Sequence, residues 1–586
     1  MKLSRSLLAA AGFVACAAGV PAYAINIDQT LMGGWTEITP APATTRRGIN
    51  LQYFKIGPEL GNVLAVGFLY DNDGNQVWFT GNDGQVRPGD TTLEFNISTI
   101  EGGRPIGSSD AGSPNATPVG TLTMEINDCN NATATIDSAT LGTSTFAVDR
   151  GESIGLTFGA DECAYQQPFQ GCPSFATEGL APRSCIVSGT LQGDVVFTND
   201  TTWVLNGPVF VGTDIDEGGQ AATLSIEPGT RVIGAAGNDF LGVQRGSKLF
   251  AEGTPFAPIV FTGPIPSDDP TVGPGTWGGL VINGRAPINV CDSGICTDVG
   301  EGGSGVFGGD DPNDSSGVLR YVRVQFAGFR INDEDELNGI AFQGVGQNTI
   351  VDHVQVHANA DDGIEFFGGN VNAKNIVLSD IQDDSLDWTH GWTGNLQYVV
   401  VRQDQTPNVE AERGIEADNF EDNNDATPRS QPRISNVTFI GTDNGTLTTT
   451  GFLFRRGTGV NMSNAIVTGF NNCFDLDSSA TFAAAGTPAA LSGALTVQNT
   501  MLNCANNFEI EDGDAFSVET FFTSQTGNST GNPQLDGVFP PAGADYLSGF
   551  DLDRNIFPVF FDNADYLGAF NGEGTAWTHG WTEFLE

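Results

Sequence analysis

The chain has 586 residues, and its 71 acidic residues against 24 basic ones give a formal net charge of −47. So few basic residues cannot provide the positive surface that nucleic acids require, and anionic lipid headgroups are disfavoured for the same reason. The 77 glycines and only five methionines are typical of short strands joined by turns. A chain of this length needs several domains or a repeat that extends in one dimension.

Residues 1–24 have the features of a secretory signal peptide, with a basic start, an apolar run over 7–18 and a small-x-small cleavage site at Ala22-Tyr23-Ala24. An alternative is lipid attachment at Cys16, because Phe13-Val14-Ala15-Cys16 is close to a lipobox. No later segment approaches the roughly 18 to 20 apolar residues of a membrane span. We therefore expect an exported protein, extracellular or on the outer cell surface, with the periplasm and a lipid anchor as alternatives.

Eight cysteines remain after Cys16, and an even number in an exported chain favours disulfides over metal ligands. Cys291 and Cys296 are predicted to close a short loop. Cys473 and Cys504 are predicted to bridge neighbouring repeats. The other four are expected to pair among themselves in an order that the sequence leaves open: Cys129, Cys163, Cys172 and Cys185.

Residues 25–165 are expected to form a β-rich N-terminal module, followed by a cysteine-containing linker over 166–185. Apolar runs at 64–70 and 76–79 flank the turn Asp71-Asn72-Asp73-Gly74-Asn75, which predicts a hairpin. The strings Tyr70–Trp78 and Gly120–Cys129 resemble a β-module that recurs in secreted proteins of Gram-negative bacteria.

From Cys185 onward, short apolar runs alternate with Gly, Pro and Asn turns at a spacing of roughly 15 to 25 residues. Each unit has an apolar face that it cannot bury alone, so successive units must stack. Leu224–Ile233 and Trp277–Ile282 resemble the opening coils of right-handed β-helices in secreted bacterial proteins. We therefore predict an all-β chain: a small β-rich N-terminal module, a right-handed parallel β-helix over 186–548 and a C-terminal capping tail over 549–586.

Seven short strands repeat one pattern, at residues 339–342, 363–366, 385–388, 414–417, 451–454, 473–476 and 507–510. Their second and fourth positions are nearly always apolar, and alternation directs these to one face and the third position to the other. The third positions form an outward ladder that is mostly acidic, with Glu365, Asp387, Glu416, Asp475 and Glu509.

The string Trp-Thr-His-Gly-Trp-Thr occurs twice, at 388–393 and 577–582. One interpretation is an aromatic corner that seals a coil. The other is stacking of Trp388, Trp392, Trp577 and Trp581 on sugar faces. Together with Trp277-Gly-Gly and Tyr566–Phe570, this string resembles a family of secreted β-helix proteins widespread in Bacteroidetes and marine proteobacteria, which implies the fold and leaves the function open.

The densest acidic group comprises two motifs 22 residues apart, Asp361-Asp362-x-x-Glu365 and Asp383-Asp384-x-x-Asp387. This separation is about one coil, so the motifs are expected to stack at about the 4.8 Å strand spacing. Carboxylates this close cannot all stay ionised without a partner, and few basic residues are nearby. Oxygen ligands suit calcium, so all six acids are predicted to bind Ca²⁺. The alternative is separate, solvated acidic turns.

The second motif is similar to the calcium site of family 9 polysaccharide lyases, in which Asp-Asp-x-x-Asp follows another Asp one coil earlier. In such enzymes a metal binds the uronate carboxylate and a lysine removes the neighbouring carbon-bound proton. This chain departs from that pattern, because only arginines lie downstream of the motif. Some lyases of other families use an arginine as the base, which makes Arg413 or Arg402 the candidate here.

His353 and His357 share one strand face if the strand alternates regularly. They are either a metal-binding pair or surface histidines that contact a turn.

Three functions fit these observations, and whether the chain is an enzyme stays open. The first is a calcium-stabilised surface or extracellular protein that binds a polysaccharide or another cell-envelope component, or supports envelope or matrix structure. The second is a calcium-dependent polysaccharide lyase, or another carbohydrate-active enzyme, acting on uronate polymers. The third is a partner of an outer-membrane uptake system.

Overall fold

The computed structural model describes residues 33–37, 48–57, 60–70, 76–86, 92–101, 115–127, 131–150 and 171–585, the last range without 182, 264–272, 292, 333–334, 406–409, 443–448, 492, 573–575 and 584. The signal peptide, Cys16, Cys129 and Cys163 lie outside these residues. The chain divides into two compact units, Met1–Pro168 and Phe169–Glu586.

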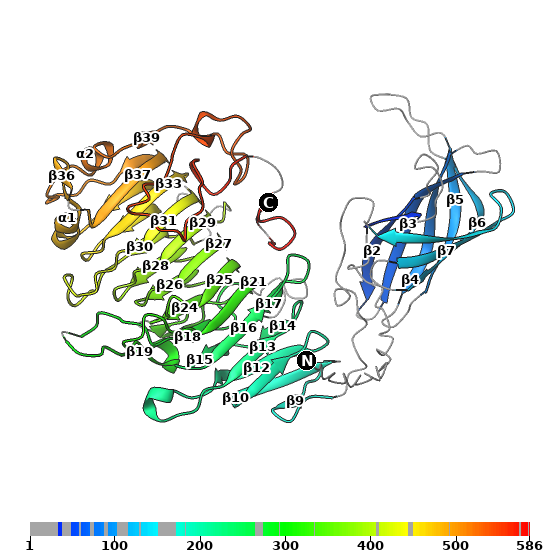
Figure 1. The fold of residues 1–586 in the computed structure, drawn as a ribbon, viewed down its shortest axis with the longest axis horizontal. Coiled ribbons are helices and arrows are strands. Elements are labelled where there is room, and N and C mark those ends of the chain that lie inside the picture. Colours follow the sequence, from blue (N-terminus) through cyan, green and yellow to red (C-terminus); the bar gives the residue numbers. More distant parts are fainter. Residues whose placement is uncertain are drawn as a thin grey trace, which may run out of the picture. The chain divides into compact units, whose positions relative to one another are not determined.

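The first unit is a closed antiparallel barrel in which each strand pairs with the next and β1 pairs with β8 (Figure 1). Its strands are β1 (Gly33–Glu37), β2 (Gly48–Gly57), β3 (Leu60–Tyr70), β4 (Gln76–Val86), β5 (Thr92–Glu101), β6 (Asn115–Ile126), β7 (Asn131–Ser138) and β8 (Ser144–Arg150). The predicted hairpin is confirmed, because β3 and β4 pair antiparallel with Tyr70 opposite Gln76.

The second unit is the predicted right-handed parallel β-helix. Its first coils contain β10 (Ser184–Leu191), β11 (Asp194–Phe197), β12 (Thr202–Val211), β13 (Thr223–Ile226), β14 (Arg231–Gly234), β15 (Phe240–Val243), β16 (Lys248–Glu252), β17 (Ile259–Thr262) and β18 (Gly279–Asn283). At the beginning of the stack, β9 (Ala176–Glu178) pairs antiparallel with β10. Phe175 there stacks on the buried ring of Trp203 at 5.8 Å and covers the apolar core.

Two parallel ladders form the later coils (Figure 1). The long strands are β21 (Gly317–Gln325), β25 (Ile350–His357), β27 (Asn372–Ser379), β29 (Asn395–Arg402), β31 (Arg433–Ile440), β33 (Val460–Thr468) and β37 (Leu495–Asn503). The short strands are β24 (Ile340–Gln343), β26 (Ile364–Phe367), β28 (Leu386–Thr389), β30 (Arg413–Ala417), β32 (Thr450–Phe454), β34 (Asn472–Leu476) and β38 (Asn506–Phe508). Each strand pairs with its counterpart one coil away.

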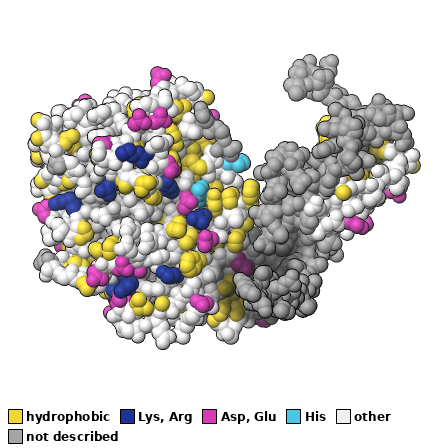
Figure 2. Space-filling view, in the orientation of Figure 1, with side chains coloured by type: hydrophobic (Ala, Val, Ile, Leu, Met, Phe, Trp, Pro, Cys, Tyr) yellow, Lys and Arg dark blue, Asp and Glu magenta, His cyan; other side chains and the backbone are white. Residues whose placement is uncertain are grey.

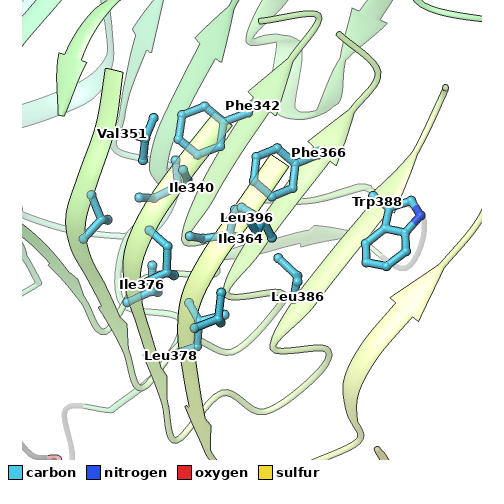
Figure 3. Close-up of a cluster of buried hydrophobic side chains, with 14 of the residues drawn as sticks. Ile340, Phe342, Val351, Ile364, Phe366, Ile376, Leu378, Leu386, Trp388 and Leu396 are labelled. Atoms are coloured by element: carbon cyan, nitrogen blue, oxygen red, sulfur yellow. The ribbon is translucent and has the colours of Figure 1, made fainter. Parts of the chain in front are cut away.

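The short strands have the register that the repeat predicts. Ile340 pairs with Ile364 and Ile364 with Leu386, and these side chains lie in the core shown in Figure 3. The ladder of third positions is also confirmed from Glu365 to Asp387 and Glu416. The pattern is wrong at its last member, because Ile510 lies beyond the end of β38 and is 72% exposed.

Each long strand turns a corner at one residue with a left-handed backbone conformation. These residues stack in register and have φ between 46° and 62°: Tyr321, His353, Asn375, Tyr398, Asn436, Asn464 and Asn499. Asparagine tolerates this conformation better than most side chains. The corner lets β21 pair with β16 on one side and β17 on the other.

A segment that we call the C-terminal strap, residues 549–572 and 576–583, runs back along this corner towards earlier coils (Figure 1). Asn464 donates a hydrogen bond to the Phe550 carbonyl. Arg323, which lies five coils earlier in the stack, donates to the Trp581 carbonyl. The strap therefore covers the outside of the stack. The end of the stack is covered instead by α2 (Val518–Thr523), whose Phe522 ring lies 5.6 Å from that of Phe474.

Both predicted disulfides are confirmed, Cys291–Cys296 and Cys473–Cys504. Cys172 pairs with Cys185, which settles one of the pairings that the sequence left open. The remaining small elements are β19 (Asp298–Gly300), β20 (Gly305–Phe307), β22 (Arg330–Asn332), β23 (Asp335–Glu336), β35 (Gly486–Thr487), β36 (Ala490–Leu491), β39 (Ser529–Thr530) and α1 (Ser479–Ala485).

Candidate metal centre

The two acidic motifs lie in turns that precede neighbouring strands of the short ladder. Glu365 of β26 is paired with Asp387 of β28, so the motifs stack one coil apart. The Gly363 amide donates to the Asp384 carbonyl at 2.9 Å, and the Asp384 amide donates to Oδ1 of Asp362 at 3.0 Å. These bonds hold the two turns in one register.

The stacking brings all six predicted metal ligands into overlapping groups. Within each group, one ligand atom per residue lies within 4.8 Å of those of the others. The groups are Asp362 with Asp383 and Asp384; Asp362 with Glu365 and Asp387; Asp384 with Asp387 and Glu416; and Asp361 with Asp383 and Glu336. Buried acidic clusters of this kind have the geometry to hold a metal ion.

Burial makes this concentration of negative charge costly. It raises the pKa of Asp361 to about 8 and that of Asp383 to about 7, with neighbouring carboxylates adding to the effect. The pKa values of Asp362, Glu365, Asp384 and Asp387 are raised well above their usual range, first by burial and then by the charges around them. The folded chain therefore favours protonation of these groups or the binding of a cation.

Arginines neutralise one side of the group, which corrects the expectation that few lie nearby. The Arg413 guanidinium is 3.5 Å from Asp384 and 3.2 Å from Glu416. Arg455 pairs with Glu416 and Asp418. Within the described part of the chain, no arginine or lysine forms an ion pair with Asp362, Glu365 or Asp387, so this set has no direct basic partner.

Oxygen atoms without hydrogen-bond partners lie in the same place. Asn338 donates from Nδ2 to Oε2 of Glu365 at 2.7 Å, while its own Oδ1 is buried without a partner among the described residues. Oδ1 of Asp387 is likewise buried and unpartnered there. Buried acceptors of this kind are costly, and a cation would satisfy them. The residues present therefore fit a hard metal ion.

A cavity of about 320 Å³ opens beside these ligands. Glu365, Asp387, Glu416 and Asp418 line it together with Arg455 and Arg456, which form ion pairs with Glu416 and Asp418. His390 and Phe420 complete the wall, and Nε2 of His390 is 3.4 Å from Asp298. The pKa of Asp298 is lowered by its hydrogen bond to His390. The third positions of the ladder thus face a cavity rather than open solvent.

The two arginines suggested as bases occupy different surroundings. Burial alone would lower the pKa of Arg413, but Asp384, Glu416 and Glu412 together raise it above its usual range. Arg402 lies at the end of β29 and forms its ion pair with Asp380 at 3.7 Å. Arg413 is therefore in the centre as a charge partner of carboxylates, and Arg402 is paired outside it.

Three of the four tryptophans proposed to stack on sugars are inaccessible. Trp388 and Trp392 are fully buried in the β-helix core, where Trp392 stacks on Phe366 at 4.0 Å. Trp581 is 1% exposed and packs against His353 and Tyr321. The stacking interpretation fails for these three residues, and the aromatic-corner interpretation describes them. Trp577 alone of the four is only half-buried.

The histidines form no metal pair. His353 is a corner residue with φ of 56°, so the strand does not alternate regularly between His353 and His357. The His353 ring packs against the Trp581 ring. His357 is 5% exposed, and its Nδ1 lies 3.0 Å from the Ser379 hydroxyl. Burial lowers the pKa of His357 to about 4.

The sequence interpretation missed Glu336, Asn338, Arg455 and Glu416 as parts of this centre. Glu416 carried a signal, because it stands at the third position of a repeat. Glu336 and Asn338 come from the segment around β23, and nothing in its sequence relates it to the two motifs. Arg455 follows β32, three coils from Glu365, and only the register shows that it reaches Glu416.

Comparison with known proteins agrees with the observed fold. Residues 189–582 match the family described as a pectate-lyase-like β-helix domain. The chain therefore belongs to the pectate-lyase-like β-helix family, which supports a role related to carbohydrates.

A comparison with curated proteins finds no match. Among solved structures, the chain is similar to a variant of the catalytic domain of a GH87 alpha-1,3-glucanase in complex with tetrasaccharides. The sequence identity is 8%, the TM-score is 0.25, and the match covers 87% of this chain and 99% of that chain. A likeness this remote does not bear on function.

Two further observations concern the setting of the protein. Its three described disulfides are consistent with an exported protein. None of the helices among the described residues has the length and apolar character needed to cross a membrane. On the face shown in Figure 2, lysine and arginine side chains lie singly or in small groups between acidic ones and form no continuous basic surface.

Proposed function

We propose that this chain is an exported carbohydrate-binding β-helix protein that holds Ca²⁺ at Asp362, Glu365 and Asp387, with Asp384 beside them. The observation that carries the proposal is the convergence of these buried carboxylates from two coils without an arginine or lysine paired to the first three among the described residues. A bound cation would supply the missing positive charge and satisfy Oδ1 of Asp387.

Calcium suits this set better than other common metals. The donors are carboxylate oxygens, with an amide oxygen of Asn338 nearby and no cysteine or histidine in any of the groups. Calcium accepts such oxygens in irregular geometries, whereas zinc favours nitrogen and sulfur and magnesium demands a regular octahedron. Two of the ligands, Glu365 and Asp387, also line the 320 Å³ cavity, so an ion bound by them would have coordination positions open to a bound sugar.

That cavity supports a polysaccharide as the bound partner. An ion held by Glu365 and Asp387 would attract the hydroxyl or carboxylate oxygens of a sugar entering beside it. Arg455 and Arg456 line the same cavity, and the N–H groups not used in their ion pairs with Glu416 and Asp418 offer donors to the same sugar oxygens. A uronate polymer has both kinds of oxygen, and it is the partner that we propose for this cavity.

A calcium-dependent lyase is the second candidate function, favoured by the family assignment and by arginines facing the same cavity. Arg413 is poorly suited to act as its base, because removing a proton from Arg413 would leave Asp384, Glu416 and Glu412 without their charge partner. Incubating the protein with calcium and uronate polymers separates binding from cleavage through the near-ultraviolet absorbance of unsaturated products. Cleavage that is lost in Arg402→Ala, or lost in Arg413→Ala while the calcium-dependent Tm shift is retained, would identify the base.

Thermal unfolding in calcium and in chelator tests the proposed site. An ion bound only by the folded state stabilises it by mass action, by about 2.7 kcal/mol when the ion is at a hundredfold its Kd. Calcium should raise the Tm of the wild type, Asp387→Asn should abolish this shift, and Asp384→Ala should weaken or abolish it. Asp551→Ala, an exposed acid in the strap, is the matched control and should keep the full shift. Equal Tm values in calcium and chelator would refute the site.

A further inference from the structure

The corner column and the C-terminal strap enclose a second cavity, with a volume of about 420 Å³. Below it, Trp581 packs its ring over His353 and Tyr321. Above it, Asn436 donates to the Tyr566 carbonyl and Asn464 donates to the carbonyls of Phe550 and Ala564. Between these attachments, Asn375 and Tyr398 face the cavity instead of a close-packed strap.

Aromatic rings form much of the wall. Trp577 stacks on Phe570 with ring centroids 5.5 Å apart, and Phe570 lies 4.8 Å from Phe539. The Trp577 indole donates from Nε1 to the Ala569 carbonyl at 3.0 Å, which fixes the orientation of its ring. Trp577 is half-buried and Phe539 is 39% exposed, so a ligand can reach this wall. Trp577 also stacks on Trp581 with ring centroids 6.3 Å apart, so the apolar surface left for a sugar is the Phe539 ring and the exposed rim of Trp577.

Neutral polar groups complete the wall. The hydroxyls of Tyr398 and Tyr566 hydrogen-bond to each other. The Asn375 side chain, unlike those of Asn436 and Asn464 in the same column, forms no hydrogen bond to any residue that the structure describes. None of the described residues that line the cavity is charged, and the nearest described acid, Asp562, hydrogen-bonds to the Tyr398 side chain.

From these contacts we infer that the cavity is a binding site for a neutral pyranose unit of a glycan. A pyranose has an apolar face for the Phe539 ring and the exposed rim of Trp577, and peripheral hydroxyls for Asn375 and Tyr398. The volume lies within the usual range for small-ligand sites, roughly 300 to 1,000 Å³. The site shares no residue with the metal centre, so it would provide a second, calcium-independent contact with carbohydrate. The inference extends the proposed carbohydrate binding and does not depend on the metal.

Isothermal titration with four neutral hexasaccharides, namely cello-, laminari-, manno- and xylohexaose, tests the inference. At least one should bind to the full chain, and binding should persist in chelator. Trp577→Ala should weaken that binding at least tenfold, and Asn375→Gly, which keeps the left-handed backbone without strain, should weaken it measurably. Trp78→Ala, which removes a 55% exposed tryptophan of the barrel unit, should bind as the wild type does.

Calcium-dependent Tm shifts measured on the same variants show that each is folded and keep the two hypotheses apart. Trp577→Ala and Asn375→Gly should retain the full shift, whereas Asp387→Asn should lose the shift and keep its neutral-sugar binding. Absence of binding to all four sugars, unchanged affinity in both cavity variants, or loss of binding in chelator would overturn the second site without affecting the metal centre.

Discussion

Asp475 is a buried acid of the ladder outside the metal centre, and its ionisation lowers the stability of the folded state. It stands at the third position of the repeat 473–476 in β34 and is only 7% exposed. Burial raises its pKa to about 7, and the charges of Glu509 and Glu511 add to the effect. The folded state therefore holds a proton on Asp475 that the unfolded chain releases at a much lower pH.

Because the folded-state pKa is raised, the contribution of Asp475 to stability is largest at about pH 4 and is lost as the pH rises to about 7. Asp475→Asn removes this ionisation. We expect the variant to unfold with a free energy larger than that of the wild type by about 2 to 4 kcal/mol at pH 8 and to differ little at pH 4. Denaturant unfolding at both pH values, in chelator, measures the difference. A gain that is equal at the two pH values would contradict the titration of Asp475.

At the scale of the element, the repeat in the short strands was predictable because alternation in a strand needs no tertiary information. Ile364, Phe366 and Glu365 alternate between core and ladder as expected. The long strands were less predictable, because a left-handed corner at His353 reverses the faces of the residues that follow. In four coils the corner residue is an asparagine, which indicates a left-handed backbone in the sequence. The tyrosine and histidine at the same position in other coils give no such indication.

The partners of the acidic motifs were beyond prediction for a different reason. Arg455 reaches Glu416 from 39 residues away, and the coil lengths that set this register vary along the chain. Asn338 comes from an irregular connection. The sequence could therefore identify the six acids but not the arginines that neutralise Glu416 and Asp418.

The disulfides differ in what they connect, and their removal should differ too. Cys473–Cys504 joins β34 to the residue that follows β37 and closes a loop of 31 residues, whereas Cys291–Cys296 closes one of five. By the chain-entropy estimate, these loops correspond to about 3 to 4 and about 2 kcal/mol. We expect Cys473→Ala/Cys504→Ala to lower the free energy of unfolding more than Cys291→Ala/Cys296→Ala, as measured by denaturant titration. The reverse order would show that the short loop stabilises chiefly by packing.

At the scale of the whole β-helix unit, the strap changes how stability is shared. Coils of a solenoid contact only their neighbours, so stability is approximately a sum of local terms. The strap adds contacts across many coils: Arg323 donates to the Trp581 carbonyl and pairs with Glu583, and Gln355 donates to the Glu583 carbonyl. These contacts connect residues more than 220 positions apart.

Trp581→Ala tests this coupling. Loss of a fully buried tryptophan should cost about 3 to 5 kcal/mol and release the strap from Tyr321 and His353. Hydrogen exchange should then accelerate in β21 and β25 but not in β13, which the described strap does not contact. Uniformly faster exchange throughout the unit would indicate global destabilisation instead of local release.

The direction of the strap also affects the order in which the native structure can be completed. Coils 184–440 can stack as soon as each emerges during synthesis, since every strand needs only its predecessor. The outer surface of β21 and β25, however, stays uncovered until residues 577–583 have been made, more than 220 residues later. Some of the earliest coils to form are thus among the last to have their outer surface covered. A chain that stops before the strap would expose Tyr321, His353 and the aliphatic side chains beside them, and these could associate with other incomplete chains.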